Sequence, residues 1–329
     1  ENAMGYMRWK VSPAQLSALL DDISVLNARE KKSLLYNTQA LFSAGEIELG
    51  EMMTVMDVLV DDKDPMIGRA VVSTLNDFLY LVDKDNEAIF GQFAANKLTP
   101  WFERLGVEDQ LSDSTDTTRL RGSVYGILSR YANTPKVEKV SAELANKYLE
   151  DPTSVPRSIA TRALRNMSRF SEQDWFTKLR DFYVANTDAN IRSTVSRAMI
   201  FTDEQKIAKT LDFALSDHVS PANAITNVYF AISGLDDQTM FYAWLDLNFD
   251  ALSKKMPAYH IASMPEYFST SCDADNIKLA EKFYADKKAN FDGMARSYDI
   301  AMDSAKQCLS LKQANQANFN RYLQVATKH

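Results

Sequence analysis

Hydrophobic positions recur along most of the chain at the spacing of amphipathic helices. The segment "DPMIGRAVVSTLNDFLYLV" (64–82) is a clear example. Residues three or four apart lie on one face of an α-helix, so an apolar stripe at that spacing predicts a helix with one buried side. The stripe in this segment consists of Ile67, Val71, Thr74, Leu75, Phe78 and Val82.

Residues typical of helix ends stand at the borders of these stripes. Ser12 and Asp64 each precede a proline, and Asn27 precedes another helical pattern. Side chains of this kind accept hydrogen bonds from the first N–H groups of a helix, and proline is tolerated at the first helical position. Gly45 can end the second helix, because glycine readily adopts the left-handed conformation found there.

Short polar links rich in Asp, Asn, Ser and Thr separate the predicted helices. Short links make consecutive helices antiparallel neighbours. The pattern therefore predicts an all-α fold, an α-α superhelix of stacked helix pairs like those of HEAT and armadillo proteins, without a repeat of fixed period. Near the end of the chain, the predicted helices cover 257–268, 273–288, 293–311 and 313–326.

The longest polar stretch between helices is "GVEDQLSDSTDTT" (106–118). It is a candidate hinge between a smaller N-terminal group of helices and the main array. With this hinge inside it, residues 12–329 are predicted to form one helical domain. The preceding segment, "GYMRW" (5–9), is rich in aromatic residues and is typical of a β-strand instead. Residues 1–11 are therefore expected to be the remnant of a preceding sheet domain.

Composition and charge exclude several functions. Only 10 Gly and 9 Pro occur in 329 residues, which favours long helices with short connections. The net charge of −7 argues against binding to nucleic acid, since neutralising phosphates requires a basic surface. No apolar run approaches the roughly 18 residues of a membrane span.

Several segments together resemble the C-terminal helical domain of the thermolysin-like zinc aminopeptidases, the family of aminopeptidase N, puromycin-sensitive aminopeptidase and the endoplasmic-reticulum aminopeptidases. "GYMRW" (5–9) resembles the Gly-Tyr-Tyr-Arg-Val that precedes that domain, with Met7 and Trp9 as departures. "EKKSLLYNTQALFSAGEI" (30–47) resembles an Arg-x-x-Leu-Leu-x-Asp-x-x-x-Leu-x-x-x-Gly segment, with Asn37 in place of the Asp. Three later segments also resemble the family: "LRGSVYGIL" (120–128), "WLDLNFDALSKKMP" (244–257) and "FNRYL" (319–323).

This resemblance implies a role without catalysis. In that family, the helical domain forms a bowl that encloses the substrate cavity and contacts the far end of the peptide, while zinc is held in a separate catalytic domain. The implied partners are the catalytic and β-sandwich domains of the same parent chain and a peptide substrate. Residues 1–11 would then be the last strand of the β-sandwich.

The chain lacks the residues that such catalysis requires. Zinc aminopeptidases use His-Glu-x-x-His, in which two histidines one turn apart hold Zn²⁺ and the glutamate activates water. Here the three histidines are His218, His260 and His329, and none is followed by Glu or lies four residues from another. We therefore expect no cofactor and no enzymatic activity in this chain alone.

Arginines in two neighbouring helices are candidates for contact with a peptide. Arg162, Arg165 and Arg169 fall on one face of a predicted helix, and Arg192 and Arg197 lie on a following one. Guanidinium groups bind carboxylates through charge-assisted, bidentate hydrogen bonds. The alternative is a solvated outer face whose arginines pair with acidic neighbours.

Arg121 and Tyr125, in the 120–128 segment, are further candidates for peptide contact. A simpler interpretation of Tyr125 is packing between helices, with its hydroxyl bonded to the main chain.

Cys272 and Cys308 lie at equal distances from the expected turn of the 273–288/293–311 hairpin, near residue 290. Equal distance means equal height on antiparallel helices, so the two sulfurs could form a disulfide if the Cα atoms approach within about 4.4–6.8 Å. The alternative is a pair of buried free thiols. A disulfide would favour a periplasmic or secreted protein, and free thiols a cytoplasmic one.

Two functions from different classes remain after these observations. The first is the non-catalytic, cavity-enclosing domain of a zinc aminopeptidase. The second is a stand-alone helical-repeat scaffold that binds other proteins. Complete solenoids carry polar capping repeats at both ends, and the strand-like segment 5–9 favours the aminopeptidase domain.

Overall fold

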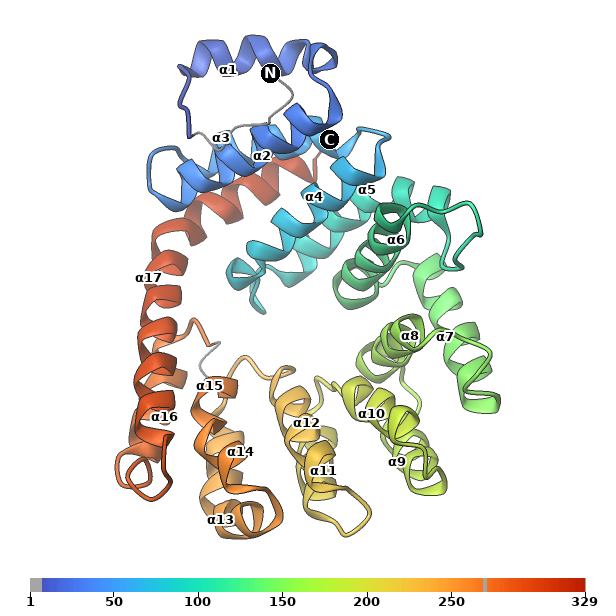
Figure 1. The fold of residues 1–329 in the computed structure, drawn as a ribbon, viewed down its shortest axis with the longest axis vertical. Coiled ribbons are helices and arrows are strands. Elements are labelled where there is room, and N and C mark those ends of the chain that lie inside the picture. Colours follow the sequence, from blue (N-terminus) through green and yellow to red (C-terminus); the bar gives the residue numbers. More distant parts are fainter. Residues whose placement is uncertain (1–7, 269–270, 329) are drawn as a thin grey trace. The chain divides into compact units, whose positions relative to one another are not determined.

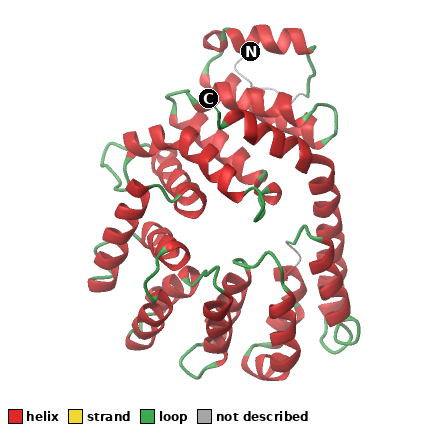
Figure 2. Ribbon diagram, turned by 180° about the vertical axis from the view of Figure 1, so that it is seen from behind, coloured by secondary structure: helices red, strands yellow, loops and turns green. Residues whose placement is uncertain are grey.

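The computed structural model describes residues 8–268 and 271–328. Within these two ranges the chain forms helices, turns and loops, and no β-strand (Figure 2). The predicted all-α fold is confirmed for this part of the chain. The chain divides into two compact units: unit 1 comprises Glu1–Ala132 and Asn315–His329, and unit 2 comprises Asn133–Ala314.

Unit 1 is a set of packed helices that follow one another along the chain (Figure 1). α2 contacts α3 and α4, α4 contacts α6, and α5 contacts both α6 and η3. The last turns of helix α17 belong to the same unit. The elements are α1 (Pro13–Asp21), η1 (Ile23–Val25), α2 (Ala28–Ser43), α3 (Leu49–Val60), α4 (Pro65–Asp77), η2 (Leu79–Leu81), α5 (Glu87–Leu105), α6 (Thr115–Ile127) and the π-helical turn η3 (Leu128–Ala132).

The helix ends follow the local sequence. Ser12 and Asn27 cap α1 and α2, and each forms a capping box with the third residue of its helix. Asp64 accepts a hydrogen bond from the N–H of Met66 at the start of α4. Gly45 has φ +72°, the left-handed conformation that glycine adopts without strain. The predicted caps are therefore confirmed.

The close approach of α5 to η3 depends on a glycine. A Cβ atom added to Gly91 would overlap the main-chain carbonyl oxygen of Tyr131. Phe90, the preceding residue, packs edge-on against the ring of Tyr131, with centroids 5.0 Å apart. The small residue thus lets the two backbones touch while the neighbouring ring fills the space beside them.

Unit 2 consists of helices in two layers. α8, α10 and α12 contact one another in series, and α9, α11 and α13 form a second series. Successive helices such as α7 and α8, or α11 and α12, pair across the layers. The elements are α7 (Pro135–Glu150), α8 (Arg157–Phe170), α9 (Trp175–Ala185), α10 (Ala189–Ala198), α11 (Glu204–Leu215), α12 (Pro221–Ile232), α13 (Thr239–Lys255), α14 (Ala258–Ala262), α15 (Met264–Phe268), α16 (Ala274–Tyr284) and α17 (Met294–Ala326), whose last turns belong to unit 1.

Two helix boundaries were predicted wrongly. The predicted helices 293–311 and 313–326 form the single helix α17. Its hydrophobic positions continue across residue 312, and no glycine or proline interrupts it. The predicted helix 257–268 is instead split into α14 and α15 at Ser263. Pro265 accounts for the break, since proline donates no main-chain hydrogen bond to the preceding turn.

Residues 1–7, including most of the predicted strand 5–9, lie outside the described residues. Of the rest, Arg8 and Trp9 belong to no β-ladder. The main chain of Trp9 is instead paired with one side chain of α2: its N–H donates to Asn37 Oδ1 (3.1 Å), and its carbonyl accepts from Asn37 Nδ2 (2.6 Å). Asn37 is buried, so its amide satisfies both main-chain polar groups of Trp9 and its own side chain at once.

The predicted hinge at 106–118 lies within unit 1, between α5 and the first turn of α6. The chain passes from unit 1 to unit 2 between Ala132 and Asn133, and returns between Ala314 and Asn315. The hinge itself stays a prediction.

Candidate functional site

Three side chains from α8, α10 and α12 form a cluster in unit 2. The guanidinium of Arg165 lies 4.6 Å from the ring centre of Phe230, and that of Arg197 lies 5.9 Å from it. Arg165 Nε also donates a hydrogen bond to the main-chain oxygen of Arg197 (2.7 Å). We call these three residues the arginine–phenylalanine cluster.

The geometry of this cluster suits recognition of an anion. The face of an aromatic ring attracts a cation, so Phe230 stabilises both guanidinium groups near one another. A guanidinium that lies over a ring keeps N–H groups at its edge for further hydrogen bonds. Arg165 is half-buried and Arg197 is exposed. The cluster therefore places two cationic groups where solvent or a ligand can reach them.

Arg162 and Arg169, the other predicted arginines of α8, each make a contact within that helix. Arg162 Nη1 donates to the main-chain oxygen of Ser158 (2.7 Å), and Arg169 lies 5.6 Å from the ring centre of Phe170. The three α8 arginines keep the predicted helical spacing, and Arg165 reaches across to α10 and α12.

Arg192 points toward the other layer. Its guanidinium lies 5.0 Å from the ring centre of Tyr183 in α9, and its Nε donates to the main-chain oxygen of Asn186 (2.6 Å). Arg192 and Arg197, both predicted candidates for contact with a peptide, therefore lie in different surroundings. The position of Arg192 on α10 turns it toward α9, whereas Arg197 lies near the opposite end of the helix.

Sequence reasoning missed the aromatic residues of this region. Tyr229 precedes Phe230 on α12, and their ring centres are 5.1 Å apart. Tyr229 also packs against Tyr267, at 6.1 Å. A signal was present: adjacent residues of a helix point about 100° apart, so two neighbouring aromatic residues cannot both face a narrow core. Both side chains are in fact half-buried.

The side chain of Arg121 is buried and bonded within the chain. Its side chain is 1% exposed, and it pairs with Asp109 (Nη1 to Oδ1, 2.7 Å) and Asp113 (Nη2 to Oδ2, 2.6 Å). Its Nε donates to the main-chain oxygen of Leu105 (3.0 Å). The guanidinium thus holds the end of α5 and the following loop to α6. Each of its three guanidinium nitrogens has a partner within the chain, and a contact of Arg121 with a peptide stays a prediction.

Two neighbours of Arg121, Asp113 and Tyr125, also have structural roles. The pKa of the Asp113 carboxyl is lowered, first by a hydrogen bond from the main-chain N–H of Gln110 and then by Arg121. Tyr125, one turn after Arg121 on α6, is fully buried and stacks on Phe102 with ring centres 5.9 Å apart. Tyr125 therefore packs between α5 and α6, as its simpler interpretation predicts.

The two cysteines form a disulfide in unit 2. Cys272 and Cys308 have Cα atoms 5.0 Å apart, and the bond closes a sequence separation of 36 residues. It joins the segment just before α16 to the middle of α17. Both residues are half-buried, not fully buried as the alternative of two apolar thiols would have them.

Comparison with known families decides what this fold is. A family model described as the ERAP1-like C-terminal domain matches residues 1–307. The chain belongs to the ERAP1-like C-terminal domain family. The resemblance to the helical domain of zinc aminopeptidases is thereby confirmed. No curated protein sequence matches the chain.

Membership of the ERAP1-like C-terminal domain family implies a non-catalytic domain of an aminopeptidase. Residues 8–268 and 271–328 contain no group of three or more His, Cys, Asp or Glu side chains placed to hold a metal ion. Across the same ranges, every helix is too short or too polar to cross a membrane.

Proposed function

We propose that this chain encloses the substrate cavity of a zinc aminopeptidase and positions the far end of the peptide. The observation that carries this proposal is the match of the ERAP1-like C-terminal domain over residues 1–307. Its partners are the catalytic and β-sandwich domains of the same parent chain, and the zinc ion belongs to the catalytic domain. A domain in this role contributes to catalysis by orienting the substrate and excluding water.

The arginine–phenylalanine cluster is the contact we assign to the peptide. A peptide carries a carboxylate at its C-terminus, and two guanidinium groups on one ring can bind it with charge-assisted hydrogen bonds. The protein as a whole has a net charge of −7 and repels anions at long range. A local concentration of positive charge is therefore needed to hold a carboxylate, and Arg165 and Arg197 supply it.

Peptide binding by the isolated chain tests this contact. We expect a fluorescent peptide with a free C-terminus to bind, in an anisotropy titration, about tenfold more tightly than the same peptide with a C-terminal amide. Replacing both arginines (Arg165→Met with Arg197→Met) should remove that difference. Arg119→Met is the matched control, because Arg119 is exposed on α6 in unit 1. Equal binding of acid and amide by the unchanged chain would refute the contact.

A second experiment tests the role of the whole domain. Mixing the chain with the separately produced catalytic and β-sandwich domains should restore a dependence of cleavage on peptide length. If length preference is the same with and without this chain, the enclosing role is wrong. In that case the alternative, a stand-alone helical scaffold that binds other proteins, is favoured.

The cysteine pair bears on the compartment. Disulfides persist in oxidising compartments such as the periplasm or the extracellular space, and the Cys272–Cys308 bond supports such a location. Thiol labelling of protein extracted under acid quench tests this: labelled cysteines would contradict it.

A further inference from the structure

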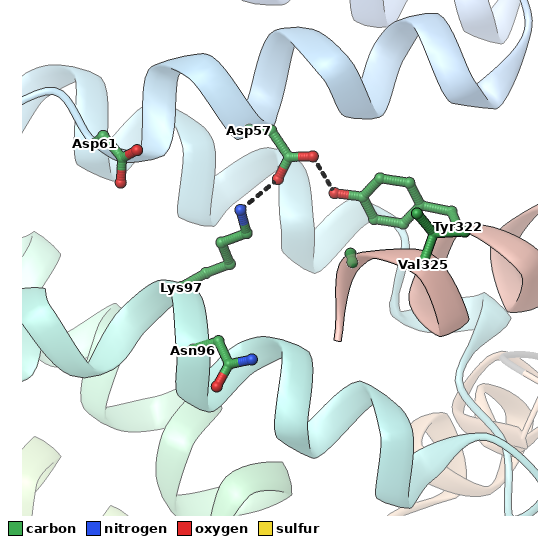
Figure 3. Close-up of a pocket in the computed structure, with 7 residues that line it drawn as sticks. Asp57, Asp61, Asn96, Lys97, Tyr322 and Val325 are labelled. Carbon is green, nitrogen blue, oxygen red and sulfur yellow. Dashed lines mark hydrogen bonds and ion pairs between the residues drawn. The ribbon is translucent and has the colours of Figure 1, made fainter. Parts of the chain in front are cut away.

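A pocket in unit 1, separate from the arginine–phenylalanine cluster, has polar side chains that the proposed function does not use. It has a volume of about 610 Å³ and lies between α3, α5 and the last turns of α17 (Figure 3). Volumes of this size are typical of small-molecule sites. Its lining includes Asp57 from α3 and Asp61 directly after that helix, Asn96 and Lys97 from α5, and Tyr322 and Val325 from α17.

The ammonium of Lys97 is held in a fixed position in this pocket. Its Nζ lies 2.9 Å from Asp57 Oδ1, and the hydroxyl of Tyr322 donates to Asp57 Oδ2 (2.6 Å). Both oxygens of Asp57 are thus engaged by the chain, so Asp57 serves to position its partners. Asp57 forms an ion pair with the Lys97 ammonium, which has three N–H groups, and the Lys97 side chain is 27% exposed. The ammonium can therefore also bind a ligand.

Tyr322 maintains this arrangement over a wide pH range. Burial and the hydrogen bond to Asp57 raise the pKa of the Tyr322 hydroxyl far above its usual value, so it stays a donor. The ring of Tyr322 packs edge-on against Phe93, with centroids 5.7 Å apart. These two contacts connect the end of α17 to α3 and α5 and fix one wall of the pocket.

A free negative charge lies on the same side of α3. Asp61 follows Asp57 by four residues and is the C-cap of α3 with a helical backbone conformation, so the two side chains lie on the same side of that helix. Asp61 is exposed, in contrast to the paired Asp57. Asn96, next to Lys97 on α5, is also exposed and adds an amide that can donate or accept hydrogen bonds. The pocket therefore combines a fixed ammonium, a solvated carboxylate and an amide.

We propose that this pocket binds a small zwitterion of the α-amino acid class. The ligand carboxylate pairs with Lys97, and its ammonium pairs with Asp61. A simple anion would be repelled by Asp57 and Asp61, and a simple cation by Lys97. A zwitterion satisfies both signs at once. This assignment does not depend on the proposed aminopeptidase role, because it uses residues of unit 1 and none of the arginine–phenylalanine cluster.

Calorimetric titration of the whole chain with L-leucine tests the proposal. At about pH 6.5 both free α-amino groups of the probes are protonated. We expect saturable binding of leucine, and binding at least about tenfold weaker for leucinamide, which lacks the carboxylate, and for N-acetyl-leucine, which lacks the ammonium. If leucine produces no saturable heat, or leucinamide binds as tightly as leucine, the assignment of a zwitterion is wrong.

Variants locate the binding in this pocket. Asp61→Asn and Lys97→Met should each weaken leucine binding about tenfold or more, while Lys139→Met, an exposed lysine of α7, should leave it unchanged. Lys97→Met removes the partner of Asp57, so circular dichroism must show an intact fold. Asp61→Asn keeps the test valid in either case, since Asp61 is exposed. Unchanged leucine affinity in Asp61→Asn overturns the proposal.

Discussion

Arginines in two regions of this protein differ in burial and in their partners. In unit 1, Arg121 is almost completely buried, and the chain supplies an acceptor for each of its guanidinium nitrogens. In unit 2, Arg165 and Arg197 lie over the ring of Phe230 and stay partly accessible. Arg121, with a partner for each guanidinium nitrogen and almost no exposure, stabilises the fold, whereas the partly accessible Arg165 and Arg197 are the arginines that we propose bind a carboxylate.

The two regions also differ in how their units are held together. Around Arg121, the end of α5, the following loop and α6 are joined by ion pairs and hydrogen bonds. Both cysteines of the chain belong to unit 2, where their disulfide joins α17 to the segment before α16. The stability of unit 2 should therefore respond to reductant, and that of the Arg121 region to loss of charge.

The largest expected effect follows from removing the disulfide. Replacing Cys272 and Cys308 with serine should lower the free energy of unfolding of unit 2 by about 3–4 kcal/mol, because the bond closes a loop of 36 residues and restricts the unfolded chain. Hydrogen exchange measures this for α16 and the part of α17 up to Ala314, against α2 to α6. An equal loss of protection in both groups would show that the two units do not differ in this way.

Removing the buried arginine should have nearly as large an effect in unit 1. Arg121→Met should destabilise the fold by about 3 kcal/mol, because it breaks a buried ion pair and leaves the Leu105 carbonyl unsatisfied. Arg165→Met should cost only about 1–2 kcal/mol, for a partly exposed cation–π contact and the hydrogen bond to the Arg197 carbonyl. Urea unfolding of both variants measures the difference. Equal destabilisation would erase the contrast between the two sites.

A smaller effect is expected when the shared ring is replaced. Phe230→Leu keeps an apolar side chain but removes the aromatic face, so it should cost about 0.5–1 kcal/mol of stability for each cation–π interaction that it abolishes. It should also reduce the preference for a peptide with a free C-terminus. Thermal unfolding and the anisotropy titration give the two values. If the preference for the free acid is unchanged, the ring does not position the arginines for binding.

The smallest effect is a pH dependence at the Arg121 site. The folded-state pKa of Asp113 lies below its usual value, so its stabilising contribution is fully present above about pH 4 and is lost as the pH falls through the folded pKa. Asp113→Asn should therefore be less stable than the unchanged protein at neutral pH, and the gap should narrow below about pH 4. Urea unfolding across this range measures it. A gap that widens at low pH would contradict the assigned direction.

Most helices could be predicted from sequence because their signals are local. The caps at Ser12, Asn27 and Asp64 depend on residues within one turn, and the apolar stripe of α4 requires only helical spacing. The family resemblance also came from short segments in their order along the chain. Two predicted helix boundaries are wrong. The hydrophobic pattern of α17 is continuous and forms one helix, and Pro265 divides α14 from α15.

The burial and the partners of individual side chains could not be predicted from local sequence. Sequence spacing placed Arg121 and Arg165 on helices, but which of them is buried depends on Asp109 and Asp113 in a loop and on Phe230, 65 positions after Arg165. The sequence alone determined an all-helical member of its family with no zinc motif of its own. Tertiary structure alone decided which arginines are saturated, because burial and hydrogen-bond partners come from residues distant in sequence.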